Sequence, residues 1–386
     1  MQQFDQQFSI DFSFPVHFTR SVFSERNPTF LSTVRRLEHD KLHRILVIVD
    51  SNVVLSHPSL LESIRNYAGA FPENLSLVAP PILVQGGESS KNDLVHVLDL
   101  LEHINAYGMD RQSFVTVIGG GAVLDMACFA TAIAHRGIRT IRIPTTVLGQ
   151  GDSGVGVKNG LNLFGKKSFI GTCVPPFAVI NDANFIETLE QRDKIAGIAE
   201  GVKVSLLRDP QFFMFLEHNA AELAKAEPSA LQYMIRQCAE LHLRHIRERG
   251  DPFELGSSRP LDFGHWSAHK LESLTGHELR HGEAVAIGMA LDIIYSTKKG
   301  YLQHSTADRI LRLLEKLGFE LWNDRLGDSK LLAGIEEFRE HLGGKLHITL
   351  LRDVGEPFEV HEMDETLIGK SIESLRTRSQ VSATAE

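Results

Sequence analysis

Residues 114–135 read FVTVIGGGAVLDMACFATAIAH and contain a strand, a turn and a helix in immediate succession. The run FVTVI is apolar on both faces, which is typical of a strand buried inside a parallel sheet. Three glycines, Gly119 to Gly121, open the helix and allow backbone N–H groups to approach a phosphate there. Because the turn departs from the standard GxGxxG fingerprint, a dinucleotide site and a structural tight turn are both open readings.

The alternation of strand and helix continues on both sides of this stretch. Further strands are expected at 44–49, 79–84 and 140–146, and helical patterns follow the first two at 57–70 and 94–107. Buried strands that alternate with helices predict a parallel sheet covered on both faces. We therefore expect an α/β, Rossmann-like domain with a parallel sheet in the N-terminal half.

The pattern changes at about residue 184 to long amphipathic helices, with one further strand expected at 346–351. A chain of 386 residues is long enough for two domains. We place an α/β domain at 1–183 and a mostly α-helical domain at 184–386. The tail, 374–386, is expected to be disordered.

Composition narrows the class of protein. The net charge of −9, from 40 Lys and Arg against 49 Asp and Glu, does not favour a nucleic-acid partner. The N-terminus lacks a basic segment before an apolar stretch, and no run of about 18 apolar residues occurs. We expect a cytoplasmic protein that does not enter a membrane. Cys128, Cys173 and Cys238 are expected to be buried, reduced thiols.

Polar side chains follow the ends of the predicted strands, and open α/β sheets bind ligands in the crevice at that edge. The group comprises Asp50, Asn52, Glu88, Lys91, Thr145 and Thr146. Together with the glycine turn, these strand ends predict a bound nicotinamide dinucleotide.

The segment RPLDFGHWSAHKLESLTGHELRHGEAVAIG, residues 259–288, holds His265 and His269 four residues apart. That spacing places both on one face of a helix, and His281 can join them from the next helix. His277 is expected to be an ordinary histidine. Core or surface positions are the competing interpretation for His265 and His281.

A metal bound by two imidazoles needs a further anionic ligand, and the cysteines are poorly placed to supply it. Glu200 is the candidate, because it lies on an otherwise apolar helical stretch with Lys203 one turn later. A surface Glu–Lys pair is the alternative. Two histidines and a glutamate would leave coordination positions open, which is typical of catalytic zinc.

Residues 149–171 read as a flexible, lysine-bearing loop that could meet an anion, and it includes Asp152, Lys158 and Lys167. A solvated surface loop is the alternative. Arg136, at the end of the glycine helix, is another cation that could reach a phosphate.

Taken together, these motifs resemble those of the sugar phosphate cyclase superfamily, whose best-known member is 3-dehydroquinate synthase. The resemblance covers roughly residues 44–355. The matching motifs are GGESSK (86–91), GGGAVLD (119–125), PTT (144–146), the loop 152–167, AEGVK (199–203), GHWSAH (264–269) and HGEAVAIG (281–288).

The resemblance implies a homodimeric, NAD-dependent enzyme with zinc or cobalt held by Glu200, His265 and His281. It also implies a 3-dehydroquinate synthase-like fold, with an α/β Rossmann-like domain and a mostly α-helical one. The positions implied for cofactor binding are Asp50, Asn52, Glu88, Lys91, Gly120, Gly121, Ala122, Asp125, Thr145, Thr146, Leu148, Lys167, Phe185, Thr188 and Leu189.

Four positions depart from the 3-dehydroquinate synthase pattern. Asp262 and Ser258 stand where that enzyme has an asparagine and an arginine, and His341 matches a lysine near the C-terminal strand. Ser168 follows Lys167 in place of an asparagine. Groups suited to hydroxyls or carbonyls thus replace cations that would pair with a substrate carboxylate. The pattern is similar to that of sedoheptulose 7-phosphate cyclases, such as 2-epi-5-epi-valiolone synthase, and of ebo-cluster cyclase-like proteins.

The resemblance implies a carbon–oxygen lyase that closes a cyclitol ring with loss of phosphate and no net redox change. The implied catalytic residues are Asp152, Lys158, Lys203, Asp262, His269 and His341. The phosphate would meet Lys158, Lys167, Ser168, His269 and Arg136, the last from its own or a partner subunit. Alternatives are 3-dehydroquinate synthase itself, a metal-dependent polyol dehydrogenase, and a non-catalytic relative that binds a sugar phosphate.

Overall fold

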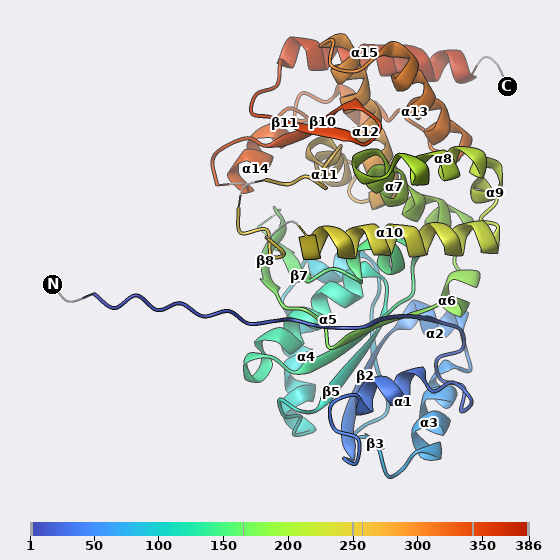
Figure 1. Cartoon of the computed structure of the whole chain (residues 1–386), viewed down its shortest axis with the longest axis vertical. Helices are drawn as coiled ribbons and strands as arrows, with labels where there is room; N and C mark the ends of the chain where they lie inside the picture. Colours follow the sequence, from blue (N-terminus) through green and yellow to red (C-terminus); the bar gives the residue numbers. More distant parts are fainter. Residues whose placement is uncertain (1–2, 165, 249–250, 257, 342, 384–386) are drawn as a thin grey trace.

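The computed structural model describes residues 3–383 except 165, 249–250, 257 and 342. The lower half of Figure 1 is a sheet flanked by helices, and the upper half is mostly helical. The predicted α/β fold with a helical C-terminal part is confirmed.

The large sheet pairs its strands in the order β1-β9-β6-β5-β2-β3, with β4 beside β2, and all of these pairings are parallel. Its strands are β1 (Val16–Thr19), β2 (His43–Asp50), β3 (Leu75–Leu77), β4 (Ile82–Val84), β5 (Phe114–Gly119), β6 (Arg139–Pro144) and β9 (Ala178–Asp182). Because the strands are parallel, their carboxyl ends lie along one edge of the sheet.

Successive residues of β2 point to opposite faces and enter two different hydrophobic cores, as the strand period requires. Leu46 and Ile48 pack with the helices α4 and α5, whereas Ile45 and Val47 pack with α1 and α3. The helices of this half are α1 (Thr29–Arg35), α2 (Ser51–Ser56), α3 (Leu60–Ala70), α4 (Val95–Ala106) and α5 (Gly121–Ile133). Burial on both faces explains why β2 and β5 read as continuous apolar runs.

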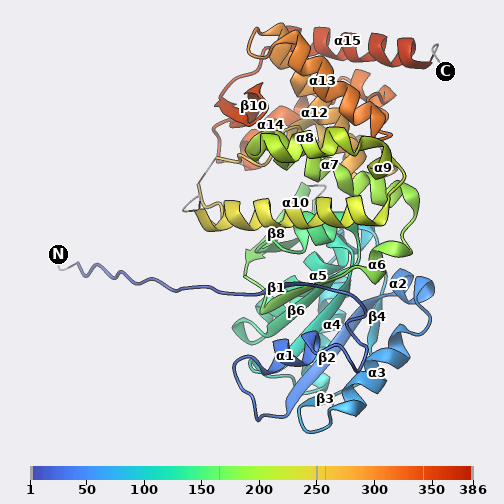
Figure 2. The same ribbon diagram turned by 45° about the vertical axis from the view of Figure 1, so that its right-hand side comes forward.

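The second half is built around α12, which packs against α7, α11, α13 and α15. Its helices are α6 (Asn184–Glu187), α7 (Gln191–Arg208), α8 (Pro210–His218), α9 (Ala220–Ala224), α10 (Pro228–Glu248), α11 (His265–Leu274), α12 (His281–Lys298), α13 (His304–Lys316), α14 (Ala333–His341) and α15 (Glu365–Ala383). β10 (Ile348–Asp353) and β11 (Glu356–Val360) form an antiparallel hairpin beside them. Figure 2 shows α10 lying between this bundle and the sheet.

The expected flexible loop at 149–171 is wrong, because the segment contains a π-helix at Gly149–Ser153 and an antiparallel hairpin. The hairpin consists of β7 (Lys158–Leu163) and β8 (Lys166–Cys173), and β7 contacts α5. A Cβ on Gly160 would lie 2.4 Å from the backbone oxygen of Ile170. Glycine here therefore serves close strand pairing and not flexibility.

Two smaller expectations are also wrong. The tail is helical through residue 383, because Ile368 and Leu375 on α15 are buried against the bundle. Cys173 is exposed on β8, whereas Cys128 and Cys238 are buried as expected. None of the described helices is both long and apolar enough to cross a bilayer.

Candidate active site

The loops after β2, β4 and β5 meet at the carboxyl edge of the sheet. The Asp50 side chain accepts a hydrogen bond of 2.9 Å from the backbone of Asn52 and so caps α2. A Cβ on Gly86 would lie 2.3 Å from the Asp50 carboxylate, and one on Gly121 would lie 2.8 Å from the Ser153 hydroxyl. The glycines therefore permit close backbone approach, and α5 begins with open N–H groups at this point.

Lys91 is buried between two carboxylates at the same edge. Its Nζ lies 2.7 Å from Asp125 and 3.6 Å from Glu88. Burial alone would lower the pKa of Lys91, but the two carboxylates outweigh it and raise the pKa, so the lysine is charged. Glu88 also accepts a 2.9 Å hydrogen bond from Asn162 on β7, which joins the hairpin to this edge.

The remaining residues predicted for the cofactor lie beside the ends of β6 and β9. The Thr146 hydroxyl accepts a 3.0 Å hydrogen bond from the backbone of Gly149, and Thr145 is buried next to it. The Thr188 hydroxyl lies 2.8 Å from His57, whose ring packs on Phe185. Ala122, in the first turn of α5, Leu148, at the π-helix, and Leu189, after α6, complete the set.

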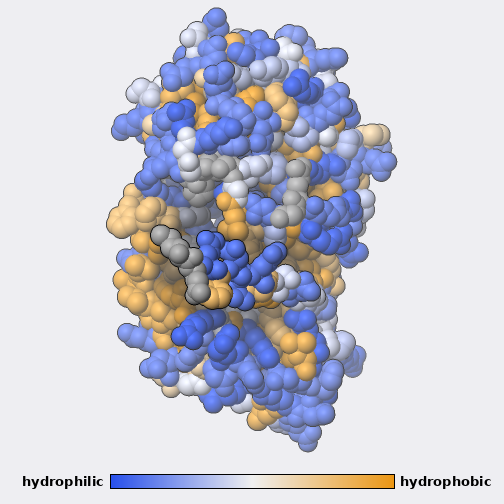
Figure 3. All heavy atoms as spheres, turned by 60° about the vertical axis from the view of Figure 1, so that its left-hand side comes forward, coloured by the Kyte–Doolittle hydropathy of each residue, from blue (hydrophilic) through white to orange (hydrophobic). Residues whose placement is uncertain are grey.

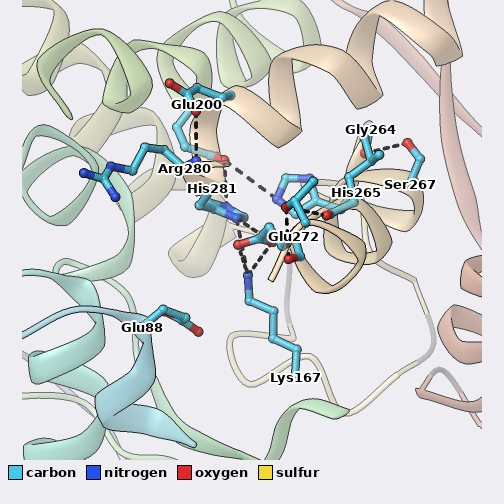
Figure 4. A network of polar contacts seen from close by, with 12 residues as sticks. Glu88, Lys167, Glu200, Gly264, His265, Ser267, Glu272, Arg280 and His281 are labelled. Carbon is cyan, nitrogen blue, oxygen red and sulfur yellow. Dashed lines mark hydrogen bonds and ion pairs between the residues drawn. The ribbon is translucent and has the colours of Figure 1, made fainter. Parts of the chain in front are cut away.

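Three predicted metal ligands converge between the two halves. The Glu200 Oε1 lies 3.7 Å from Nε2 of His265 and 3.6 Å from Nε2 of His281. These separations are too long for hydrogen bonds, and the buried oxygen accepts none from the part of the chain that the structure describes. Tetrahedral zinc with bonds of 2.0–2.1 Å separates its ligand atoms by about 3.4 Å. The three side chains, shown in Figure 4, therefore fit a small divalent metal.

The other ring nitrogens of both histidines are held by acceptors. His265 Nδ1 donates to the Phe263 carbonyl at 3.0 Å, and His281 Nδ1 donates to the Glu272 carboxylate at 3.2 Å. Each bond fixes the tautomer that leaves Nε2 free to bind a metal.

Local charges tune these ligands. Burial disfavours the charge on Glu200, but Lys203 and His281 outweigh burial and lower its pKa to about 2. Burial and Lys203 lower the pKa of His265 well below its usual value. Burial and Lys167 oppose the protonation of His281, yet the carboxylates of Glu272 and Glu200 raise its pKa to about 9. A metal would therefore displace a proton from His281.

Glu272 is a site residue that the sequence analysis missed. It is buried, and besides His281 it binds Lys167 of β8, whose Nζ lies 3.0 and 2.8 Å from its two oxygens (Figure 4). Its position seven residues after His265 puts it on the same helix face, which was the signal available in the sequence.

His269 lies one turn after His265, with 5.3 Å between the ring centroids. Burial and the charge of Lys167 lower its pKa well below the usual value, so His269 is neutral. With Glu272 and His281 it forms a second group of possible metal ligands, which shares His281 with the first. His277 lies outside both groups and is exposed, as expected for an ordinary histidine.

Asp152 and Lys203 lie beside the metal candidates. Asp152 Oδ1 is 2.8 Å from Nδ1 of His242 on α10, a residue that no sequence motif indicated. Burial would raise the pKa of Asp152, but His242 outweighs it and the pKa is lowered. Lys203 forms a buried ion pair with Glu200, and Glu200 and Asp152 outweigh burial and raise its pKa. One cation and one carboxylate thus face the site.

Asp262 lies near a group of charges from two segments. Burial raises the pKa of Asp262 to about 6, even though Lys158 opposes this. Lys158 itself forms an ion pair with Glu254, and the Arg259 Nε lies 3.4 Å from the same carboxylate. Sequence reasoning missed Glu254, because nothing in its spacing separates it from an ordinary loop acid.

Three predicted positions, Arg136, Ser258 and Ser168, do not join this cluster within one chain. Arg136 follows α5 at the amino edge of the sheet, about 20 Å of helix from the glycine turn. Ser258 bonds Glu359 of β11, and Ser168 is exposed, with its N–H donating to Asn162. His341 ends α14, and its side chain lies outside the described residues.

Comparison with known proteins assigns the chain. A sequence profile of the 3-dehydroquinate synthase N-terminal region matches residues 81–196, and the C-terminal profile matches residues 197–338. The 3-dehydroquinate synthase of Dictyoglomus turgidum is 34% identical over 317 residues, which cover 82% of this chain and 86% of that enzyme. The chain belongs to the 3-dehydroquinate synthase-like sugar phosphate cyclases. The predicted family is thereby confirmed.

Solved structures agree with this cyclase fold. The 2-epi-5-epi-valiolone synthase ValA of Streptomyces hygroscopicus subsp. jinggangensis, with NAD+ and Zn2+ bound, has a TM-score of 0.86 and 25% identity. The match covers 97% of this cyclase and 100% of ValA. A 2-deoxy-scyllo-inosose synthase with carbaglucose-6-phosphate, NAD+ and Co2+ shares the fold, with a TM-score of 0.73, 24% identity and coverage of 93% and 96%.

Proposed function

We propose that this cyclase converts sedoheptulose 7-phosphate to a valiolone-type cyclitol with elimination of phosphate. The arrangement around Asp262 carries the proposal. Lys158 and Arg259 already share the Glu254 carboxylate, and Asp262 adds a second acid nearby. An incoming carboxylate would find both cations paired and a like charge beside them, whereas a hydroxyl could donate to Asp262.

We propose NAD at the carboxyl edge of the sheet and Zn2+ or Co2+ between Glu200, His265 and His281. When bound, NAD would take up and return a hydride, and the metal would polarise substrate oxygens. The similarity to ValA, whose structure holds NAD+ and Zn2+, supports this assignment. The buried Glu200 oxygen, which accepts no hydrogen bond from any described residue, supports it independently.

The neighbouring side chains would orient the substrate. The Lys203 ammonium can donate to one substrate hydroxyl, and the ionised Asp152, held by His242, can accept from another. Lys167 is held by Glu272, but its ammonium has a further N–H that could meet the phosphate, and neutral His269 could accept a proton at a ring nitrogen. Loss of phosphate as an anion together with a proton from the neighbouring carbon, followed by aldol closure of the carbocycle, changes no net oxidation state. These residues would therefore only bind groups and move protons.

Arg136 can serve a phosphate only in the site of another subunit, since it lies at the opposite edge of its own sheet. We therefore propose a homodimer in which Arg136 contributes across the interface. We also propose a cytoplasmic enzyme whose nucleotide-binding domain ends at residue 183, with a metal- and substrate-binding domain at 184–386.

3-Dehydroquinate synthase is the second candidate, and the Dictyoglomus enzyme at 34% identity favours it. Purified protein with NAD and Zn2+ or Co2+ separates the two. Incubation with sedoheptulose 7-phosphate, or with the heptulosonate phosphate precursor of dehydroquinate, is followed by phosphate release and by NMR of the product. We expect phosphate and a cyclitol from the first substrate alone. Efficient turnover of the second would reverse the assignment, and net NADH formation would favour a polyol dehydrogenase.

A further inference from the structure

The first described residues form an extended arm, residues 3–13, that belongs to no helix or strand. In Figures 1 and 2 the arm leaves the middle of the molecule and runs away from it. Figure 3, viewed from that side, shows the arm projecting in front of the body, with apolar spheres exposed at the same height.

The arm has the sequence pattern of a half-buried strand. Phe8, Ile10 and Phe12 alternate with Ser9 and Asp11, a period of two that puts the apolar side chains on one face. Yet Phe8 is 80%, Ile10 65% and Phe12 59% exposed. An apolar strand face that lies in solvent marks a contact with another surface.

The root of the arm is anchored. Phe14 packs against Val155, Val179 and Ala239, and the chain then enters β1 at the edge of the large sheet. Phe12 touches Phe253, with 5.7 Å between the rings. The fixed root aims the rest of the arm away from its own chain.

A matching strand edge is exposed on the same chain. β8 pairs only with β7, so its outer edge has no strand partner among the described residues. Phe164 and Phe169 at the hairpin tip pack edge to face and are 82% and 49% exposed. The tip also carries Lys166, whereas the arm carries acids and no lysine or arginine. Lys166 is itself paired with Glu340 at 2.6 Å, so the match rests mainly on an unpaired strand pattern and an unpaired strand edge, each with exposed apolar side chains.

We propose that the arm of one protomer adds as a strand to the free edge of β8 in a second copy, and that the arm of the second copy adds in the same way to β8 of the first. Every chain carries both the unpaired strand and the unpaired edge, so a two-fold exchange satisfies both at once. Eleven extended residues span about 36 Å, which is enough to cross to a neighbour. The exchange would brace the hairpin that carries Lys158 and Lys167.

Oligomeric state tests the proposal without substrate, metal or NAD, so its failure is distinct from failure of the proposed reaction. The variant combines Phe8→Ser, Ile10→Ser and Phe12→Ser, and the control combines Ser9→Ala and Ser13→Ala on the opposite face. By sedimentation, we expect the first to raise the dimer dissociation constant at least about a hundredfold and the control to leave it unchanged. An unaltered constant in the triple variant, or a monomeric wild type, would overturn the proposal.

Cross-linking between different chains tests the geometry. One chain carries Ile10→Cys and Cys173→Ser, and the other is wild type, whose exposed Cys173 lies at the end of β8. In the mixture, a short bismaleimide can join these two thiols only between chains, and we expect a dimer-sized band. A second variant carries Ile10→Cys and keeps Cys173, so that both thiols lie on one chain. If cross-linking occurs only within this chain and not between chains of the mixture, the arm folds back on its own β8.

Discussion

The Lys167 ammonium of β8 and the Glu272 carboxylate of α11 form a bidentate ion pair that joins the sheet half of the molecule to the helical half. Glu272 at the same time orients His281. We expect Glu272→Gln to lower zinc affinity about tenfold to a hundredfold, because the amide is a weaker acceptor for the ring N–H. It should also raise KM for the sugar phosphate, since Lys167 loses its anchor.

Zinc titration with a chromophoric competitor and steady-state kinetics measure these two effects. Glu337→Gln is the matched control. Glu337 of α14 forms a surface ion pair with Lys270, which lies on α11 as Glu272 does. Equal zinc affinity in wild type and Glu272→Gln would contradict the positioning role.

Glu200→Gln should abolish stoichiometric metal binding and turnover together. The amide offers a neutral oxygen in place of the carboxylate that, among the described residues, is grouped with both His265 and His281. Metal content after dialysis, by inductively coupled plasma mass spectrometry, checks the first effect. Glu283→Gln, in the first turn of α12, should retain metal. Retention of one zinc per chain by Glu200→Gln would exclude this ligand set.

Substrate choice should depend on Glu254. Glu254→Gln releases Lys158 and Arg259 from their shared carboxylate, and both cations then become available to an anionic substrate. We expect the ratio of kcat/KM for the carboxylate-bearing precursor to that for sedoheptulose 7-phosphate to rise about tenfold. Glu362→Gln, an exposed acid, should leave the ratio unchanged. A lower ratio in Glu254→Gln would argue against the role of this loop.

Stability should fall with rising pH through Asp292. This buried carboxyl accepts hydrogen bonds from Trp266 and from the Gly264 backbone, and burial raises its pKa from 3.8 to about 7. A raised acid pKa means that the folded state holds a proton that the unfolded state releases. Its contribution is therefore complete below pH 3.8 and is lost as pH rises through about 7.

Denaturant unfolding from pH 4.5 to 6.5 compares wild type with Asp292→Asn. The difference in unfolding free energy should change by about 1.4 kcal/mol per pH unit, with the variant gaining relative to wild type as pH rises. The pH dependence of this difference is diagnostic, since the loss of a hydrogen bond in the variant would change the unfolding free energy by the same amount at pH 4.5 and at pH 6.5. If the unfolding free energies of wild type and Asp292→Asn change in parallel with pH, the pKa of Asp292 is not raised.

The sequence predicted those features that depend on local pattern. The apolar runs of β2 and β5 and the turn at Gly119–Gly121 each identify an element without reference to the rest of the chain. The hairpin at 158–173 was missed because its glycines serve strand pairing, which is a property of two segments and not of one. The tail was misjudged because its few apolar residues, such as Leu375, gain their burial from α12.

The same distinction holds for the site. The grouping of Glu200, His265 and His281 could be predicted because each residue belongs to a motif that can be recognised separately in the sequence. His242 and Glu254 act through partners far along the chain, Asp152 and Lys158, and neither partnership has a sequence spacing that reveals it. The position of Arg136 depends on the edge of the sheet at which α5 ends. That edge is known only from the arrangement of the strands in the folded sheet.

The arm also bears on how the protein should be produced. A purification tag fused at the N-terminus would extend directly from residues 3–13 and compete with any contact made by Phe8 and Ile10. The opposite terminus follows α15 on the far side of the helical bundle (Figure 1). A tag placed there, or a cleavable one removed completely, leaves the quaternary structure of the native enzyme open to measurement.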